Sequence, residues 1–198
     1  LDLDLIDAIR SSLALYQQQG LKIADGTGTQ TFNFLLDRFR AWYQAEGVSS
    51  EVFQAVYLLQ PGSPMDFAMR IEAVKRFVNL PESEALAAAN KRVSNILQKT
   101  DSVEQASVDT SLFEESAETA LWQRICDVRD QTSPLFENRN YTAAMESLAV
   151  LRPEVDSFFD NVMVMADNDQ VRNNRLSMLS ELRSLFLRGA DISCLHQS

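Results

Sequence analysis

Glycine, proline and cysteine are all scarce in this 198-residue sequence, which holds six, five and two of them. So few glycines and prolines disfavour a turn-rich all-β fold. The two cysteines, Cys126 and Cys194, are too few for a disulfide framework and fit no metal-ligand spacing, so a reducing, cytoplasmic location is expected. No stretch approaches the roughly 20 apolar residues of a membrane helix. We therefore expect no membrane partner.

Groups able to carry catalysis are equally scarce. The one histidine, His196, lies two residues from the C-terminus, where a fraying chain end holds a general base or metal ligand poorly. Gly26-Thr27-Gly28 lacks the GK[ST] ending of a phosphate-binding loop. The many carboxylates form no isolated pair within an apolar run and are best explained as a solvated face. We predict neither a catalytic nor a metal site in this chain.

The charge balance is acidic, with 28 acidic and 18 basic residues and a formal net charge of −10. Residues 1–80 include 7 basic and 9 acidic residues, a net charge of −2. Residues 81–198 include 11 basic and 19 acidic residues, a net charge of −8. No Lys or Arg occurs between Asp101 and Glu118. This balance argues against a nucleic-acid partner in general, so any anion site must be a local basic patch on an acidic body.

Apolar residues recur at helical spacing along nearly the whole chain, and no segment alternates with a period of two. The pattern predicts eight helices, at about residues 4–18, 30–46, 49–60, 65–78, 81–99, 112–137, 141–160 (with a kink or short break at Pro153) and 169–195. We expect an exposed loop over residues 100–111. Long helices with short links predict an all-α, antiparallel helical bundle.

Helix-breaking prolines indicate how the chain divides into domains. The proline-rich stretch between Pro61 and Pro81 indicates a soft boundary, with a helical connecting subdomain at 1–80 and the main bundle at 81–198. The sequence starts with Leu1 rather than Met and has no signal-peptide pattern, so we expect it to begin within a longer protein.

The helix predicted to open at Pro81 combines an apolar stripe with a polar face that has no carboxylate. Four donor-bearing side chains share the polar face, with three of them at i, i+4 and i+8: Lys91, Asn95, Lys99 and, beside them, Arg92. Phosphates and base edges are bound by such donors. A plain solvated helix surface is the alternative. Asn90 falls on the apolar side, so we expect it to hydrogen-bond within the core.

The last predicted helix carries three arginines. Arg172 and Arg183 line one edge of its apolar face, whereas Arg175 projects into the apolar sector. A buried guanidinium requires a carboxylate partner. The sequence offers Asp160 or Asp167 for this structural role, across the preceding turn.

Several strings resemble the C-terminal region of the glycyl-tRNA synthetase β subunit of the bacterial two-subunit enzyme. They occur in the family's order and spacing over most of the chain: LAAANKRVSNIL at 86–97, FFDNVMVMAD at 158–167, NRL at 174–176, LFL at 185–187, ADI at 190–192 and, upstream, DRFRAWYQ at 37–44.

This resemblance implies a DALR-like anticodon-binding helical bundle with an N-terminal helical extension. It implies binding of tRNA(Gly), for which we assign Lys91, Arg92, Asn95 and Lys99, helped by Arg172 and Arg183. In the family the α subunit aminoacylates with ATP and Mg, the β subunit grips the tRNA, and the assembly is an α2β2 heterotetramer. No cofactor is therefore expected in this chain.

Two departures from the family pattern bear on these expectations. Gly189 stands where the family usually has a larger aliphatic residue, so a looser final turn is expected. The His-Asp pair of the family's HD-type domain does not occur here, so that domain is expected to lie upstream. The alternative function is a non-catalytic helical protein-interaction module that supports subunit assembly.

Overall fold

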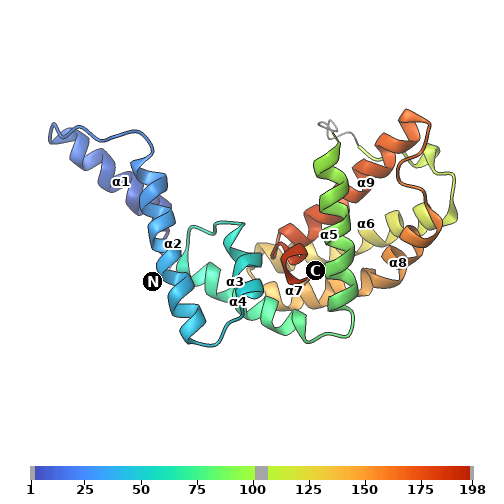
Figure 1. Ribbon diagram of the computed structural model, residues 1–198, viewed down its shortest axis with the longest axis horizontal. Helices are drawn as coiled ribbons and strands as arrows, with labels where there is room; N and C mark the ends of the chain where they lie inside the picture. The colour runs from blue at the N-terminus through green and yellow to red at the C-terminus, as the bar shows by residue number, and fades with distance from the viewer. Residues whose placement is uncertain (1–2, 101–106, 197–198) are drawn as a thin grey trace.

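The computed structural model describes residues 3–100 and 107–196 (Figure 1). Within these residues it contains no strand, which confirms the all-α fold class. Nine α-helices occur there: α1 (Leu5–Gln18), α2 (Thr27–Ala45), α3 (Ser50–Tyr57), α4 (Pro64–Val78), α5 (Ser83–Lys99), α6 (Ser116–Glu137), α7 (Tyr141–Leu148), α8 (Arg152–Asn161) and α9 (Asp169–Leu187). Three short 3₁₀-helices accompany them, η1 (Thr110–Leu112), η2 (Ala149–Leu151) and η3 (Ile192–Leu195).

The helices form an elongated molecule with a hairpin at one end and a bundle at the other (Figure 1). The hairpin of α1 and α2 projects away from the body, and α3 and α4 link it to the bundle. In the bundle, α6 packs against α7, α8 and α9, while η3 packs against α5 and α3. The last turn of the described chain therefore covers one end of α5.

The core changes character along the molecule. Near the hairpin it is aromatic, because the rings of Tyr43, Phe53 and Phe67 lie within 6.0 Å of one another, centroid to centroid. In the bundle it is mainly aliphatic, with fully buried side chains from several helices: Leu121, Ile125, Met145, Leu148, Leu179 and Leu182. Burial of these apolar stripes at ~25 cal/mol per Å² is what holds the helices together.

Most differences from the expected helix boundaries have local causes. The α2 helix begins at Thr27 rather than 30, directly after Gly26, whose φ of 80° suits glycine. The α6 helix begins at Ser116, and residue 112 belongs to η1. The segment 141–160 is three elements, since Pro153 has no N–H to donate and stands in the first turn of α8. The expected loop over 100–111 falls partly on residues 101–106, outside the described residues.

The end of α9 differs from the expected helix boundary and from the expected loose turn at Gly189. The helix stops at Leu187 instead of running to 195. The following Gly189 is buried, and a Cβ there would lie 3.1 Å from Cγ of Met145, so the glycine permits close packing rather than a loose turn. The Arg70 guanidinium donates to the carbonyl oxygens of Arg188 and Gly189 at 2.7 and 2.8 Å, which satisfies two acceptors just after the helix end.

Arg70 also joins α4 to the bundle. Its Nε donates to Asp66 at 2.8 Å and its Nη2 to the Tyr141 hydroxyl at 2.9 Å, and that hydroxyl donates to Asp66 at 2.5 Å. Burial, and then the hydrogen bond with Asp66, raise the pKa of Tyr141. The contacts of α4 thus cross the soft boundary near residue 80, and the division into 1–80 and 81–198 stays a prediction.

Candidate functional site

The α5 helix carries the polar face expected from its sequence. Its buried side is apolar except for Asn90 and two serines, and Asn90 donates to the carbonyl oxygen of Leu86 at 3.0 Å. Its other side exposes four donor-bearing residues, Lys91, Arg92, Asn95 and Lys99. Within the described residues, no carboxylate lies within ion-pair distance of the three charged ones. These donors are therefore available to a ligand.

The guanidinium of Arg92 is held against a neighbouring helix. Its central carbon lies 4.3 Å from the ring centroid of Phe159, which belongs to α8 and is partly buried. A cation over an aromatic face is attracted by the ring, here with a strength of about 0.5–1 kcal/mol at an exposed position. Phe159 was not among the expected site residues, although it lies inside the FFDNVMVMAD string.

The 3₁₀-helix η3 brings α5 and α9 together at one end of this face. Burial, and then Asp191, raise the pKa of the Cys194 thiol, whereas Lys91 and Arg183 act in the opposite direction. Both cations therefore lie near η3. Lys91 is exposed, but Arg183 is not free, because its Nη2 donates to Asp191 at 2.7 Å and the two side chains are 18% and 10% exposed.

Asp191 anchors the turn that Arg183 binds. Its carboxylate also accepts from the backbone N–H and the hydroxyl of Ser193, and its own N–H donates to the carbonyl oxygen of Ala55 in α3. The ion pair with Arg183 therefore ties the start of η3 to α9, and η3 itself packs against α3 and α5. In this structure Arg183 is engaged by the turn after α9 and is not one of the exposed donors on α5.

Arg172 occupies the first turn of α9, eleven residues before Arg183, which is ~16 Å along a helix axis. It donates to the carbonyl oxygen of Ala166 at 2.9 Å and is ion-paired with Asp169. The structure thus brings Lys91 and Arg183 to the same end of the bundle and places Arg172 apart from them, already engaged by two protein acceptors.

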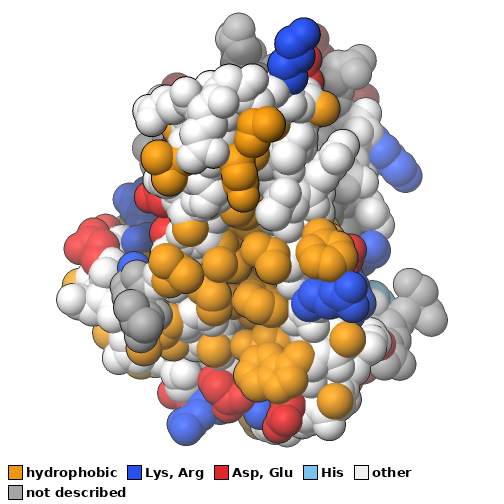
Figure 2. Space-filling view, turned by 90° about the vertical axis from the view of Figure 1, so that its left-hand side faces the viewer, with side chains coloured by type: hydrophobic (Ala, Val, Ile, Leu, Met, Phe, Trp, Pro, Cys, Tyr) orange, Lys and Arg blue, Asp and Glu red, His pale blue; other side chains and the backbone are white. Residues whose placement is uncertain are grey.

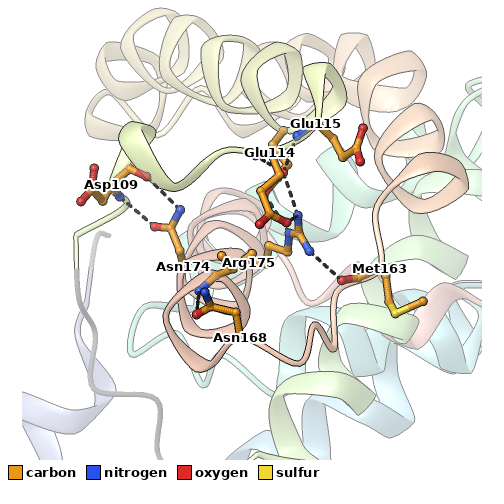
Figure 3. A network of polar contacts seen from close by, with 9 residues as sticks. Asp109, Glu114, Glu115, Met163, Asn168, Asn174 and Arg175 are labelled. Carbon is orange, nitrogen blue, oxygen red and sulfur yellow. Dashed lines mark hydrogen bonds and ion pairs between the residues drawn. The ribbon is translucent and has the colours of Figure 1, made fainter.

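Arg175 is buried, but its partners are not those expected. Figure 3 shows the guanidinium pointing toward Glu114 and toward the carbonyl oxygen of Met163, to which it donates at 3.0 Å each. Two further bonds, of 2.9 and 3.0 Å, reach the carboxylate of Glu118. The expectation of Asp160 or Asp167 was wrong: both are exposed, and the start of α6 supplies the carboxylates instead.

Glu118 is a fully buried acid in the first turn of α6. Burial alone raises the pKa of a carboxyl group, but the hydrogen bonds from Arg175 and from the backbone N–H groups of Glu115 and Glu114 outweigh it and hold the pKa of Glu118 below its usual value. A Glu at the third position of a helix is a capping signal in the sequence. It could not be recognised here, because the helix was expected to start at residue 112 and starts at Ser116.

Metal-binding side chains do not cluster among the described residues. No group of three or more His, Cys, Asp and Glu side chains there could hold a metal ion, and Cys126 and Cys194 are free thiols. No helix among the described residues is long and apolar enough to cross a lipid bilayer. The donor face on α5 is the candidate site that remains.

Comparison with known proteins finds both a matching family and similar full-length proteins. Residues 86–192 match the family described as "DALR anticodon binding domain". The chain is 47% identical over 198 residues to the glycine–tRNA ligase beta subunit of Pseudoalteromonas translucida, covering 100% of the chain and 28% of that protein. The beta subunits of Pasteurella multocida (47%, covering 98% and 28%) and Marinobacter nauticus (50%, covering 86% and 25%) are also similar. The chain thus spans little more than a quarter of these relatives, and the resemblance noted in the sequence is confirmed.

Proposed function

The chain belongs to the DALR anticodon binding domain family, and from this premise we propose that it binds the anticodon region of tRNA(Gly) as part of a glycyl-tRNA synthetase β subunit. The observation that carries the proposal is the α5 face, defined as Lys91, Arg92, Asn95 and Lys99. It is a set of exposed donors on one helix, without an ion-pair partner among the described residues, in a chain whose total net charge is −10.

The residue types on the α5 face suit an RNA loop. Proteins read such loops by hydrogen-bonding splayed bases and by contacting the backbone. Lys91 and Lys99 are eight residues apart, ~12 Å along the helix, and would bind separate phosphates as point charges. Between them, the amide of Asn95 both donates and accepts, as a base edge requires.

Arg92 adds a planar group to the same face. The central carbon of its guanidinium lies over the Phe159 ring, so the group is held close to α8 while the residue stays exposed. Such a group stacks on or hydrogen-bonds an unpaired base with little loss of freedom. The acidic surface elsewhere would repel RNA, so docking would be limited to this face.

Arg172 and Arg183 have a supporting role in this proposal. Their guanidinium groups already bind Asp169 and Asp191, respectively. Arg183 ties the start of η3 to α9, so its contribution to tRNA affinity would be indirect. The four residues of the α5 face are therefore the contacts to test first.

The complete enzyme would then divide its tasks between subunits. We propose that the α subunit uses ATP and Mg to glycylate the tRNA, that the α and β subunits form an α2β2 assembly in the cytoplasm, and that this chain contributes binding without chemistry. The scarcity of catalytic groups in its sequence supports this division.

The test is tRNA(Gly) binding by the whole synthetase as a function of salt. The double variant Lys91→Ala with Arg92→Ala should bind more weakly, and the slope of log K against log salt should fall by about one for each lost phosphate contact. The matched control is Lys75→Ala with Arg76→Ala, which removes the same charges from exposed positions on α4.

The proposal is supported if the control variant matches the wild-type enzyme in tRNA affinity and salt slope while the α5 variant loses affinity and slope. If both double variants behave alike, the effect is one of net charge and the α5 face is not the contact. The alternative, a protein-interaction module without RNA contact, predicts no change in either slope.

A further inference from the structure

The α1–α2 hairpin exposes an unusual amount of apolar surface. No residue of α1 is buried, and Leu15, Tyr16 and Leu21 are 59%, 52% and 53% exposed. Figure 2 looks onto this end of the molecule, where hydrophobic side chains form an almost continuous patch with charged groups mainly at its border. Scattered apolar residues on a surface are ordinary, but a contiguous patch marks an interaction site.

The helical pattern explains why the patch stays open. The apolar positions of α1 span about half of its circumference, by the 100° step of an α-helix. Only part of this arc is covered, where Leu5, Ile9 and Leu13 are partly buried and α1 contacts α2. Ile6 and Leu15, at the two edges of the arc, are 39% and 59% exposed.

Two grooves flank the contact between the helices. One, of about 530 Å³, is lined by residues of α1, of the connecting loop and of α2, among them Ala8, Tyr16, Ile23 and Leu35. The other, of about 380 Å³, lies on the opposite side, against Ile6, Gly28 and Phe32. Each lining has a single charged residue, Lys22 in the first and Arg10 in the second. The grooves therefore suit apolar side chains, whereas an RNA backbone needs several cations.

We propose that this apolar face packs against the remaining part of the same polypeptide in a full-length β subunit. The observation that selects this occupant is the length of the relatives, more than two-thirds of which lies outside the part that this chain covers. A covering partner within the same chain is present at high effective concentration. The N-terminal hairpin would then be a joint between the tRNA-binding bundle and the rest of the subunit.

The base of the hairpin is built as such a joint requires. The Leu5 N–H donates to the carbonyl oxygen of Gly62 at 2.8 Å, and the Gln60 amide donates to the Asn33 side chain at 3.4 Å. A Cβ on Gly62 would lie 2.8 Å from a carboxylate oxygen of Asp4, so the two segments approach as closely as glycine allows. The hairpin is thus fixed to the body at its base while its outer face remains uncovered.

A photo-crosslinker placed on the face identifies its occupant directly. In the full-length β subunit, purified with the α subunit, Tyr16→p-benzoylphenylalanine should crosslink to a peptide of the same polypeptide outside this 198-residue chain. The control, Ala14→p-benzoylphenylalanine, lies on the opposite side of α1 by helical spacing and should give no such product. A crosslink to the α subunit, to a second β copy or to tRNA, or none at all, overturns the proposal.

A stability measurement gives an independent second readout. Leu15→Lys should lower the melting temperature of the full-length subunit by a few degrees, because a charge would enter a covered apolar contact. Ala14→Lys adds the same charge to exposed surface and should leave it unchanged. Equal melting temperatures for both variants contradict the proposal. Neither variant touches the α5 face, so tRNA affinity separates this outcome from a failure of the proposed function.

Discussion

Glu118 and Arg175 form a two-point ion pair inside the helical bundle. Nε of Arg175 lies 2.9 Å from one carboxylate oxygen of Glu118 and Nη2 lies 3.0 Å from the other, and the side chains are 4% and 0% exposed. The pair joins the first turn of α6 to α9, and the same guanidinium binds the carbonyl oxygen of Met163 in the loop between α8 and α9. One side chain therefore holds three segments of the bundle together.

Removing one partner of this pair should strongly destabilise the chain. Glu118→Gln keeps the size of the side chain but leaves the Arg175 charge poorly compensated, and a broken buried pair costs about 3–5 kcal/mol. We expect the free energy of unfolding, measured by urea titration, to fall by that amount. Asp7→Asn breaks the exposed pair with Arg10 (68% and 75% exposed) and should cost about 0–1 kcal/mol. A similar cost for both variants would contradict the assigned importance of the buried pair.

The same pair should make stability depend on pH. The pKa of Glu118 is lower in the folded chain than its ordinary value of 4.5, so the unfolded chain takes up the proton first as pH falls. The contribution is therefore complete above about pH 4.5 and is lost as pH falls through the folded pKa. Urea titrations between pH 7 and pH 3 should show a steeper loss for the wild-type chain than for Glu118→Gln. Parallel curves would mean that other carboxylates cause the acid sensitivity.

The fold could be predicted largely from periodicity, whereas the polar contacts could not. The α5 stripe, with Val93 buried and Lys91 exposed, follows from the 3.6-residue repeat alone. Burial of Arg175 follows from its place in the apolar sector of α9. Its partner does not, because Glu118 is 57 residues away in the sequence and local spacing favours nearby acids such as Asp167. Pairing between residues far apart in the sequence depends on how the helices pack. That packing cannot be inferred from the spacing of residues within one helix.

The helix ends show the same limit on a smaller scale. Pro153 correctly indicated a break and stands in the first turn of α8, but its position alone did not predict the 3₁₀-helix η2 before it. After the end of α9 at Leu187, Arg70 of α4 binds the carbonyl oxygens of Arg188 and Gly189. This long-range contact could not be predicted from the α9 segment alone.

Loss of Arg183 should lower the stability of the fold without changing the salt dependence of tRNA binding. Arg183→Ala removes the main partner of Asp191, whose carboxylate is 10% exposed, and should lower the free energy of unfolding by about 2–3 kcal/mol. The salt dependence of tRNA(Gly) binding by the synthetase should keep its slope, because no phosphate contact is lost. Urea titration and binding at several salt concentrations check the two parts. A reduced slope would instead place Arg183 on a phosphate.

Phe159 should affect tRNA binding without any change in charge. Phe159→Leu keeps the α8 position apolar but removes the ring that orients Arg92 at 4.3 Å. Since such a contact is worth about 0.5–1 kcal/mol, affinity of the synthetase for tRNA(Gly) should fall about two- to fivefold. The salt slope should stay at the wild-type value, because the number of cations that meet phosphates is the same. The variant Arg92→Lys is the matched comparison: it keeps the charge but loses the planar group, so it should show the same loss in affinity and the same slope. If Phe159→Leu binds as tightly as the wild-type enzyme while Arg92→Lys does not, Arg92 acts through its own hydrogen bonds, and its orientation by α8 is not what the tRNA requires.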